Sequence, residues 1–260
     1  MSALPHAIAG SLLLAAATAW GLADKPTGIA FPSGDTVPEN LLRIELRFSA
    51  PLRNPFSIED LKLIGADGRV IEHAFLDLPL PSADGTRVTV LLEPGRVKSG
   101  LVENRDLGRA LRAGSAVTLE VDDPQLVRPV IKRWRVTDVN AEPIRPDRWR
   151  LQLPRLSTTD PLEVRFGSPL SSTAENLIAI RGPDAKRVPG AAHLIEGETA
   201  WRFVPASPWR PGFYGVVARA ELEDPAGNRL CGAFEAMAAS HIRCSDIPVQ
   251  SFQLRERSGP

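Results

Sequence analysis

The chain has 260 residues, and its 31 basic and 31 acidic side chains give a formal net charge of zero at pH 7. A neutral chain without a basic stripe offers no field to attract a polyanion, which argues against nucleic acid as a partner. The 24 prolines and 20 glycines fall between short alternating apolar segments, a pattern typical of short strands joined by turns.

The amino-terminal segment resembles an export signal. An apolar run from Ala7 to Trp20 precedes Gly21-Leu22-Ala23, whose small residues suit signal peptidase. We therefore expect a cleaved signal peptide over residues 1–23 and a periplasmic or secreted mature chain. The residues before the run lack Lys and Arg, so an uncleaved anchor is the alternative, although 14 residues are fewer than the roughly 20 that cross a bilayer. No later segment is apolar enough to span, so no membrane span is expected after cleavage.

An internal repeat is the strongest signal in the sequence. Residues 44–52, Ile-Glu-Leu-Arg-Phe-Ser-Ala-Pro-Leu, match residues 162–170, Leu-Glu-Val-Arg-Phe-Gly-Ser-Pro-Leu. Residues 111–121 match residues 209–219 less closely, and the order of the two matches is the same in both halves. Two matched blocks in one order indicate a duplicated domain, so we predict domains over residues 24–137 and 138–260.

Within each copy, apolar residues alternate with polar ones. Leu42, Ile44, Leu46 and Phe48 point one way and the residues between them the other, as in a strand with one face in a core. Asp67-Gly68 predicts a tight hairpin turn. Further strands are predicted at residues 87–93, 117–121, 131–136, 148–153, 199–204 and 213–222, with one or two helical turns at residues 104–111. Seven or so strands per copy predict a β-sandwich.

Two segments carry a resemblance to a known family. Residues 37–52, with their Phe-Ser-x-Pro-Leu motif, and residues 222–228, with Asp-x-Ala-Gly-Asn, resemble the bacterial immunoglobulin-like (Ig-like) domains of surface-layer and other envelope proteins. Residues 93–101 and the pair Pro208-Trp209 are similar to an uncharacterised group of exported two-domain proteins. The resemblance implies an all-β chain of two tandem Ig-like β-sandwich domains after the signal peptide, and it implies no chemistry. Periplasmic copper carriers share the Phe-Ser-x-Pro start, but the expected mature terminus lacks their His.

The predicted joint between the domains was considered as a calcium site. Calcium needs several loop oxygens, and the candidates are Asp122, Asp123, Asp138, Asn140 and Glu142. Arg145 and Arg148 would neutralise these acids, so we predict no metal and no cofactor. The prolines Pro143 and Pro146 predict limited hinge motion at the joint.

A charged loop is the first candidate for binding. Residues 93–105 bring Arg96, Lys98 and Arg105 between two strands, and Glu39 could pair with one of these cations across the domain end. An ion pair that fixes the loop is one interpretation, and a site for an anionic ligand or a partner protein is the other.

Aromatic residues near the end of the chain give a second candidate. Trp201, Trp209 and Tyr214 suit core packing, but residues 208–211, Pro-Trp-Arg-Pro, could instead form an exposed turn that stacks on a sugar or a peptide. The solvent exposure of Trp209 decides between these interpretations.

Cys231 and Cys244 are the two cysteines of the chain, and an oxidising compartment would favour a disulfide between them; two separate thiols are the alternative. The bridge would tether residues 245–260, in which we see little periodic apolar content.

Catalytic motifs are absent from the sequence: there is no Gly-x-Ser-x-Gly, no His-Glu-x-x-His and no phosphate-binding Gly-rich loop. We therefore expect no enzyme, but a non-catalytic exported envelope protein, an Ig-like binding or structural module for a protein partner. A carbohydrate-binding envelope protein and an envelope hydrolase that uses loop carboxylates are the alternatives.

Overall fold

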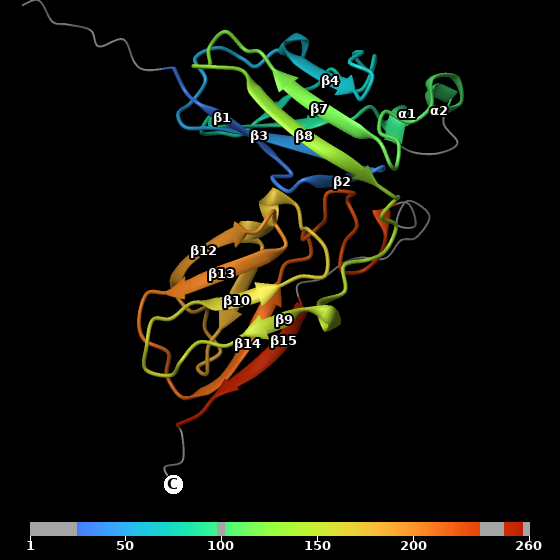
Figure 1. The fold of residues 1–260 in the computed structure, drawn as a ribbon. Coiled ribbons are helices and arrows are strands. Elements are labelled where there is room, and N and C mark those ends of the chain that lie inside the picture. The colour runs from blue at the N-terminus through green and yellow to red at the C-terminus, as the bar shows by residue number, and fades with distance from the viewer. Residues whose placement is uncertain (1–24, 98–101, 235–246, 257–260) are drawn as a thin grey trace, which may run out of the picture.

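The computed structural model describes residues 25–97, 102–234 and 247–256. It is an all-β chain of two Ig-like sandwiches, with a few short helical turns (Figure 1). These turns are η1 (Ile58–Asp60), α1 (Pro94–Val97), α2 (Val102–Leu107), η2 (Pro146–Arg148) and η3 (Ser172–Asn176).

Domain 1 contains eight strands in two sheets. They are β1 (Gly28–Phe31), β2 (Thr36–Pro38), β3 (Arg43–Phe48), β4 (Leu61–Gly65), β5 (Leu80–Pro81), β6 (Arg87–Leu91), β7 (Ala116–Val121) and β8 (Val130–Thr137). One sheet has the order β1-β3-β6-β5 and the other β2-β8-β7-β4, with β2 parallel to β8. This is the ABED and GFC strand order of an Ig sandwich, with an extra short strand that pairs with the last one.

The described residues of domain 2 form seven strands. They are β9 (Arg150–Gln152), β10 (Leu162–Arg165), β11 (Ile178–Arg181), β12 (Gly190–Ile195), β13 (Ala200–Pro205), β14 (Gly212–Ala218) and β15 (Ile247–Leu254). The sheets β12-β13-β10-β9 and β11-β14-β15 reproduce the seven-stranded constant-type arrangement. The two matched sequence blocks therefore lie on equivalent strands, β3 and β10 for the first and β7 and β14 for the second.

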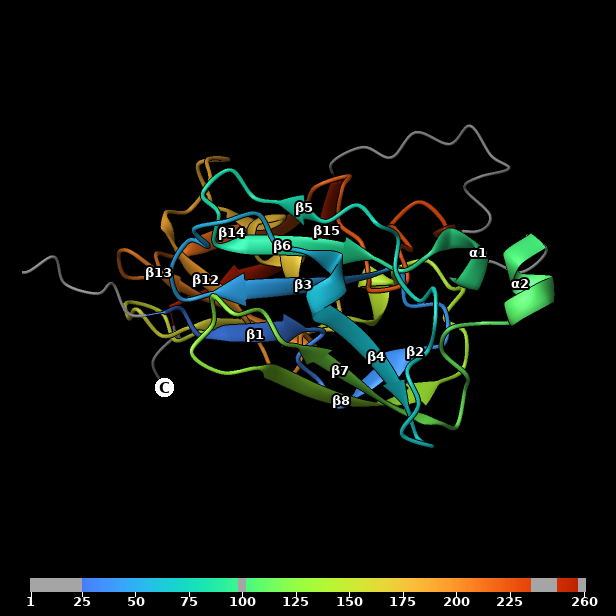
Figure 2. The same ribbon diagram turned by 90° about the horizontal axis from the view of Figure 1, so that it is seen from above.

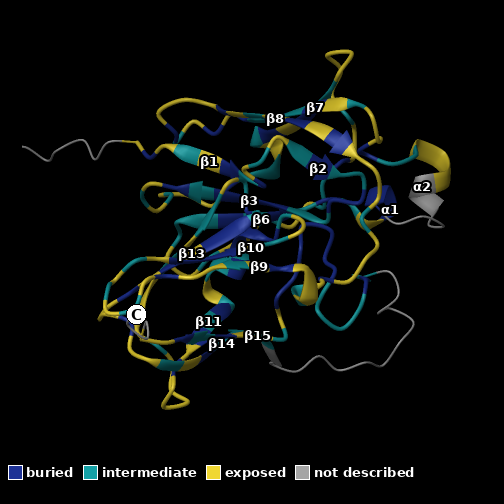
Figure 3. Cartoon of the chain, turned by 60° about the horizontal axis from the view of Figure 1, so that its bottom comes forward, coloured by how far each residue is buried: buried dark blue, intermediate teal, exposed yellow. Residues whose placement is uncertain are grey.

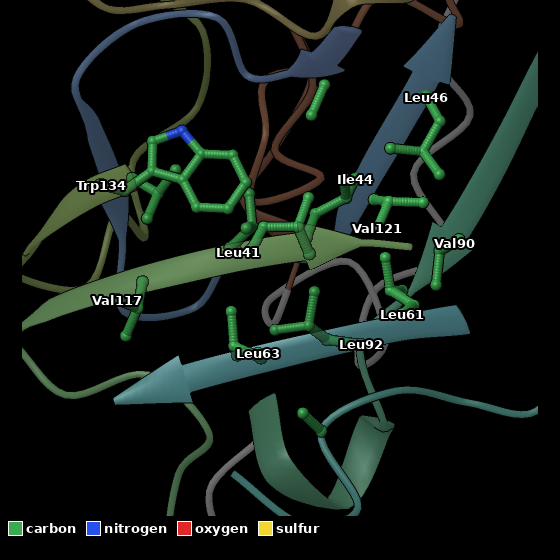
Figure 4. Packing of buried hydrophobic residues seen from close by; sticks show 14 of the residues in the cluster. Leu41, Ile44, Leu46, Leu61, Leu63, Val90, Leu92, Val117, Val121 and Trp134 are labelled. Atoms are coloured by element: carbon green, nitrogen blue, oxygen red, sulfur yellow. The ribbon is translucent and has the colours of Figure 1, made fainter. Parts of the chain in front are cut away.

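Each domain has its own apolar core. In domain 1, Trp134 packs among Leu41, Ile44, Leu63 and Leu92 (Figure 4), and its indole N–H donates to the Pro32 carbonyl at 3.0 Å. In both sandwiches the buried residues lie mainly along the strands, and the exposed ones lie mainly in the connections (Figure 3). Alternating Val, Leu and Thr residues, as in β7, suit such half-buried strands.

The Asp67-Gly68 turn forms as predicted. The Gly65 N–H donates to the Arg69 carbonyl at 2.9 Å, and Ile64 and Val70 form an isolated bridge beyond it. Gly68 has φ of 78°, a conformation that glycine adopts without strain.

The prediction that residues 245–260 lack periodic apolar content was wrong. Residues 247–254 form β15, which pairs with β14, and Phe252 and Leu254 are buried there between more exposed polar residues. Gln and Ser residues together with Pro248 dilute the apolar pattern of this strand. The end of domain 2 is consequently held by a sheet.

The equivalent phenylalanines of the two copies differ in burial. Phe48 is buried in the domain 1 core, whereas Phe166 is only half-buried and packs against Trp149 at a ring distance of 4.8 Å. In the part of the chain that the structure describes, no helix is long and apolar enough to cross a membrane.

Candidate functional site at the domain junction

The two domains meet side-on. The end of domain 2 that carries its β10–β11 and β12–β13 connections packs under the β1-β3-β6-β5 sheet of domain 1 (Figures 1 and 2). In antibody variable domains the loops at one end of the sandwich form the binding surface. Here one loop-bearing end of domain 2 is occupied by domain 1.

The side of β3 that faces away from the core supplies much of this contact. Arg43 forms an ion pair of 2.7 Å with Glu223, and Arg47 donates to the Ser172 carbonyl at 3.0 Å. Glu45 lies buried between them and accepts a hydrogen bond from Arg47. The alternation in β3 predicted that these three residues point away from their own core, and the structure places them against the other domain.

A buried polar network links domain 1, the connecting segment and domain 2. Asn40 and Asn140 exchange two hydrogen bonds of 2.9 Å each. The Asn140 amide also donates to Asp224 at 2.7 Å, and the Asn228 amide donates both to Asp224 and to the Asn140 carbonyl at 2.8 Å. Asn40, Asp224 and Asn228 are almost inaccessible to solvent. A buried polar group without a partner is costly, so this network favours one relative position of the domains.

The Asp-x-Ala-Gly-Asn segment forms the docking turn of domain 2. Asp224 accepts hydrogen bonds from the backbone N–H groups of Ala226 and Asn228, both at 2.9 Å, which closes the turn. The Leu42 N–H of domain 1 donates to the Pro225 carbonyl at 2.9 Å. Gly227 has φ of 80°, and a Cβ atom there would lie 2.8 Å from Leu42 Cδ2. The motif was visible in the sequence, but nothing in it revealed that the turn docks onto the other domain.

Asp224 is an electrostatically unusual member of this network. Burial raises the pKa of its carboxyl group from 3.8 to about 6, although the hydrogen bonds from Asn228 and Ala226 act in the opposite direction. The neighbouring Glu223 raises this pKa further, and Glu223 itself pairs with Arg43 and Arg229.

A second contact lies at the other side of the joint. Ser33, just after β1, donates its backbone N–H to Glu198 at 2.8 Å and its hydroxyl to the same carboxylate. Glu198 is only 3% exposed. A Cβ atom on Gly197 would lie 2.8 Å from the Gly34 Cα, so the two backbones approach closely.

The structure does not bring the predicted loop residues together as one site. Arg96 is buried, and its guanidinium donates to the Gly108 carbonyl at 2.7 Å and to the Glu72 carbonyl. Burial lowers the Arg96 pKa, and the nearby Arg112 lowers it further. Its contacts therefore fix the loop.

The predicted pairing of Glu39 with a cation of residues 93–105 is wrong for the part of that loop that the structure describes. Glu39 instead faces Arg109 at 3.8 Å and accepts from the Ala113 N–H at 3.3 Å. Arg105 is exposed on α2, and Lys98 lies outside the described residues.

Trp209 belongs to the core of domain 2. It is 2% exposed, its indole N–H donates to the Asp160 carbonyl at 2.8 Å, and its ring meets Tyr214 edge-on at 5.2 Å. The hypothesis of an exposed Trp209 that stacks on a ligand is therefore wrong. Trp201, the other tryptophan of this candidate site, is also fully buried.

The cysteine pairing stays a prediction, because Cys244 lies outside the described residues. Within those residues the structure contains no group of three or more His, Cys, Asp or Glu side chains that could hold a metal. Asn140, considered above as a calcium ligand, directs its side chain to Asp224.

Comparisons with known proteins give only distant structural similarities. No family model and no curated protein matches the chain. A biofilm-associated protein BSP domain is 12% identical with a TM-score of 0.27, over 91% of this chain and 30% of that one. The titin A168–A169 structure is 10% identical (TM-score 0.22; 75% and 90% covered), and the four amino-terminal Ig domains of Dscam1 are 10% identical (TM-score 0.25; 79% and 47% covered). Scores this low carry no argument about arrangement or function, and the fold assignment rests on the strand order.

Proposed function

We propose that the chain is a non-catalytic exported envelope protein whose two Ig-like domains act as one fixed module for a protein partner. The observation that carries this proposal is the joint between the domains. There one end of domain 2, with its loops, packs against domain 1 and is covered by it. A fixed joint gives the exposed faces of both domains constant relative positions.

The joint favours one angle because its groups are polar, buried and mutually paired. Opening it would separate Glu198 from Ser33, Asn40 from Asn140 and Glu223 from Arg43. Each buried polar group left unpaired costs roughly 1–3 kcal/mol unless water replaces the partner. The close backbone approach at Gly34 and Gly197 restricts sliding as well.

A module whose domains are already fixed relative to each other can bind a partner protein or act as a rigid spacer. A partner that contacts both domains does not have to order them first, which lowers the entropic cost of association. The ordinary surface of a sandwich domain supports such contacts without catalytic groups. The proposal of a protein partner is developed below at one edge of domain 1.

Scattering of the full chain tests the fixed joint. Glu198→Ala combined with Glu223→Ala should free the domains and increase the radius of gyration in small-angle X-ray scattering, while circular dichroism stays that of a β protein. Glu221→Ala combined with Glu196→Ala removes two exposed acids of the same domain and serves as the matched control. If the unsubstituted chain already requires a broad ensemble of domain angles to fit its scattering, the proposal fails.

Export is tested separately by fractionation. Expression in a bacterial host should yield a soluble envelope protein whose intact mass corresponds to a chain that starts at or next to Asp24. Recovery of the uncleaved chain from the membrane fraction would contradict export as a soluble protein.

A further inference from the structure

One edge of domain 1 combines exposed apolar and basic side chains. There β1 and the first half of β8 lie side by side, and a Cβ atom on Gly28 would lie 2.7 Å from Val130 Cγ2. We call the surface between them the β1–β8 groove. It encloses about 550 Å³ and its lining includes Gly28, Ile29, Ser33, Arg128, Ile131 and Lys132. Ile29 and Ile131 are 57% and 52% exposed, which is unusual for isoleucine.

The backbone of β8 is open along this groove. β8 pairs with β7 from residue 130 to 135, but with β2 only from residue 135 to 137. The Arg135 N–H points to the β2 side, where it donates to the Asp35 carbonyl at 2.9 Å, and the Val136 N–H points to the β7 side, where it donates to Ser115.

The open residues follow from this alternation. Because successive backbone groups of a strand point in opposite directions, Ile131 and Arg133 present their N–H and C=O groups on the same side as Arg135. No strand of the described chain pairs with that side of β8 before residue 135. An open strand edge is a template for another strand.

The charge around this edge is positive. Arg128, Arg133 and Arg135 are exposed, and none of them forms an ion pair with another described residue. Lys132 donates to the Ser33 carbonyl at 2.6 Å, and the one acidic group that it faces among the described residues is the solvent-exposed Asp35, at 3.9 Å. In a chain of zero net charge this local excess favours an acidic partner.

We propose that the β1–β8 groove binds an extended acidic segment of a partner protein, which adds as a strand to the open edge of β8. The inference rests on the proposed function, because it names the surface that the protein partner uses. Backbone groups of the partner would bond with those of Ile131 and Arg133, its acidic side chains would meet the arginines, and an apolar side chain would cover Ile131. Paired backbone donors and acceptors select a polypeptide over a nucleic acid, a glycan or a lipid headgroup.

The test uses the mature full chain and three fluorescent peptides of seven residues. The first alternates Val with Glu, the second alternates Val with Lys, and the third has the acidic composition but Pro in place of every Val. Fluorescence anisotropy should show the first peptide binding at least about tenfold more tightly than the other two, since the second repels the arginines and the third cannot form a strand.

Two matched pairs of variants separate the backbone from the charge. Ile131→Pro removes the outward N–H without removing a bond to β7, and should weaken binding of the Val-Glu peptide by about tenfold or more, whereas Ile131→Ala retains the N–H and should have a smaller effect. Arg133→Glu should also weaken binding by about tenfold, while Lys62→Glu, on the opposite edge strand of the same sheet, should not. Circular dichroism and thermal melting confirm that each variant is folded.

Three outcomes would overturn the proposal. They are the absence of measurable binding of the Val-Glu peptide, equal binding of the Val-Glu and Pro-Glu peptides, and unchanged affinity in Ile131→Pro. If a single-stranded oligonucleotide or vesicles of phosphatidylglycerol compete with affinity equal to that of the peptide, the edge is a general polyanion surface and strand addition is wrong. None of these results changes the scattering of the joint, so the fixed module is tested independently.

Discussion

Individual polar residues, rather than apolar ones, determine how the domains meet. Asp224 accepts hydrogen bonds from Ala226, Asn228 and Asn140, and so connects its own turn with the segment between the domains. Desolvation of a carboxylate in such a place disfavours its charged form. The joint therefore contains a group whose protonation changes in the mildly acidic range.

The pH dependence of stability tests this assignment. The folded-state pKa of Asp224 is about 6 and the ordinary pKa of an aspartate is 3.8, so between these values the folded chain binds more protons than the unfolded chain. The stabilisation that the protonated carboxyl contributes is thus complete below about pH 4 and is lost as pH rises through about 6, by at most roughly 3 kcal/mol. Urea unfolding at pH 4 and pH 7.5 should show that the advantage of the natural chain over Asp224→Asn shrinks at the higher pH. An advantage of equal size at both pH values, or a similar change in the exposed control Asp138→Asn, would contradict the assignment.

The two repeated phenylalanines should differ in their contributions. Phe48→Ala empties a fully enclosed site and should lower the free energy of unfolding of domain 1 by roughly 3–5 kcal/mol. Phe166→Ala should cost less, because this side chain is only partly buried beside Trp149 and its removal leaves a smaller cavity. Calorimetry of the two variants measures both values, and equal losses would show that burial does not distinguish the sites.

Among the elements, the connection that leads into β14 is fixed by hydrogen bonds from one side chain, Tyr214. The Tyr214 hydroxyl donates to the Arg210 carbonyl at 2.9 Å and accepts from the Arg210 N–H at 3.1 Å. This is the tyrosine corner of Ig domains. Domain 1 has Ala116 in the corresponding repeat position, and an alanine side chain cannot form these hydrogen bonds.

Removal of the Tyr214 hydroxyl should therefore destabilise domain 2 alone. Tyr214→Phe removes two part-buried hydrogen bonds to the Arg210 backbone, each of which contributes about 0.5–1.5 kcal/mol. Phe213→Leu, at an exposed neighbouring position, is the control and should change little. A loss shared by both melting transitions, or no loss at all, would argue against a contribution local to domain 2.

The strand pattern predicted most elements but not every edge. Clear alternation identified β3, β7, β8 and β13, because one face of each is apolar. It missed the strands β1, β2, β5, β11, β12 and β15. In β15 the Gln and Ser residues weaken the period, and the pattern could not show that β2 pairs with only part of β8. Such pairing depends on contacts between distant segments, which local alternation does not encode.

Because β15 is already paired with β14, the predicted disulfide between Cys231 and Cys244 is not needed to hold residues 247–254 in place. The chain-entropy model gives roughly 3 kcal/mol for a closed loop of about 14 residues, before strain. Reduction should lower the melting temperature of domain 2 and leave domain 1 nearly unchanged, while residues 247–254 keep their protection from hydrogen exchange. Thiol titration of denatured, exported protein is the direct measurement: none should be free in a monomer, and two per chain would refute the bridge.

At the scale of the whole molecule, the side-on joint is what the sequence could least reveal. Alternation shows which side chains of β3 leave their own core, but nothing local tells that Arg43 and Arg47 meet Glu223 and Ser172. The candidate residues chosen from the sequence, such as Trp209 and Arg96, proved to be buried within single domains. Their chemical type was informative, but their exposure depends on the tertiary fold.

Amide residual dipolar couplings of the mature chain, measured in a weakly aligned solution, test the fixed joint most directly. Couplings from the strands of both domains should fit one common alignment tensor with the domains oriented as in Figure 1, and the combination of Glu198→Ala and Glu223→Ala should abolish that common fit. If the two domains of the unsubstituted chain require alignment tensors of different magnitude, they move independently, and the account of a single fixed module is contradicted.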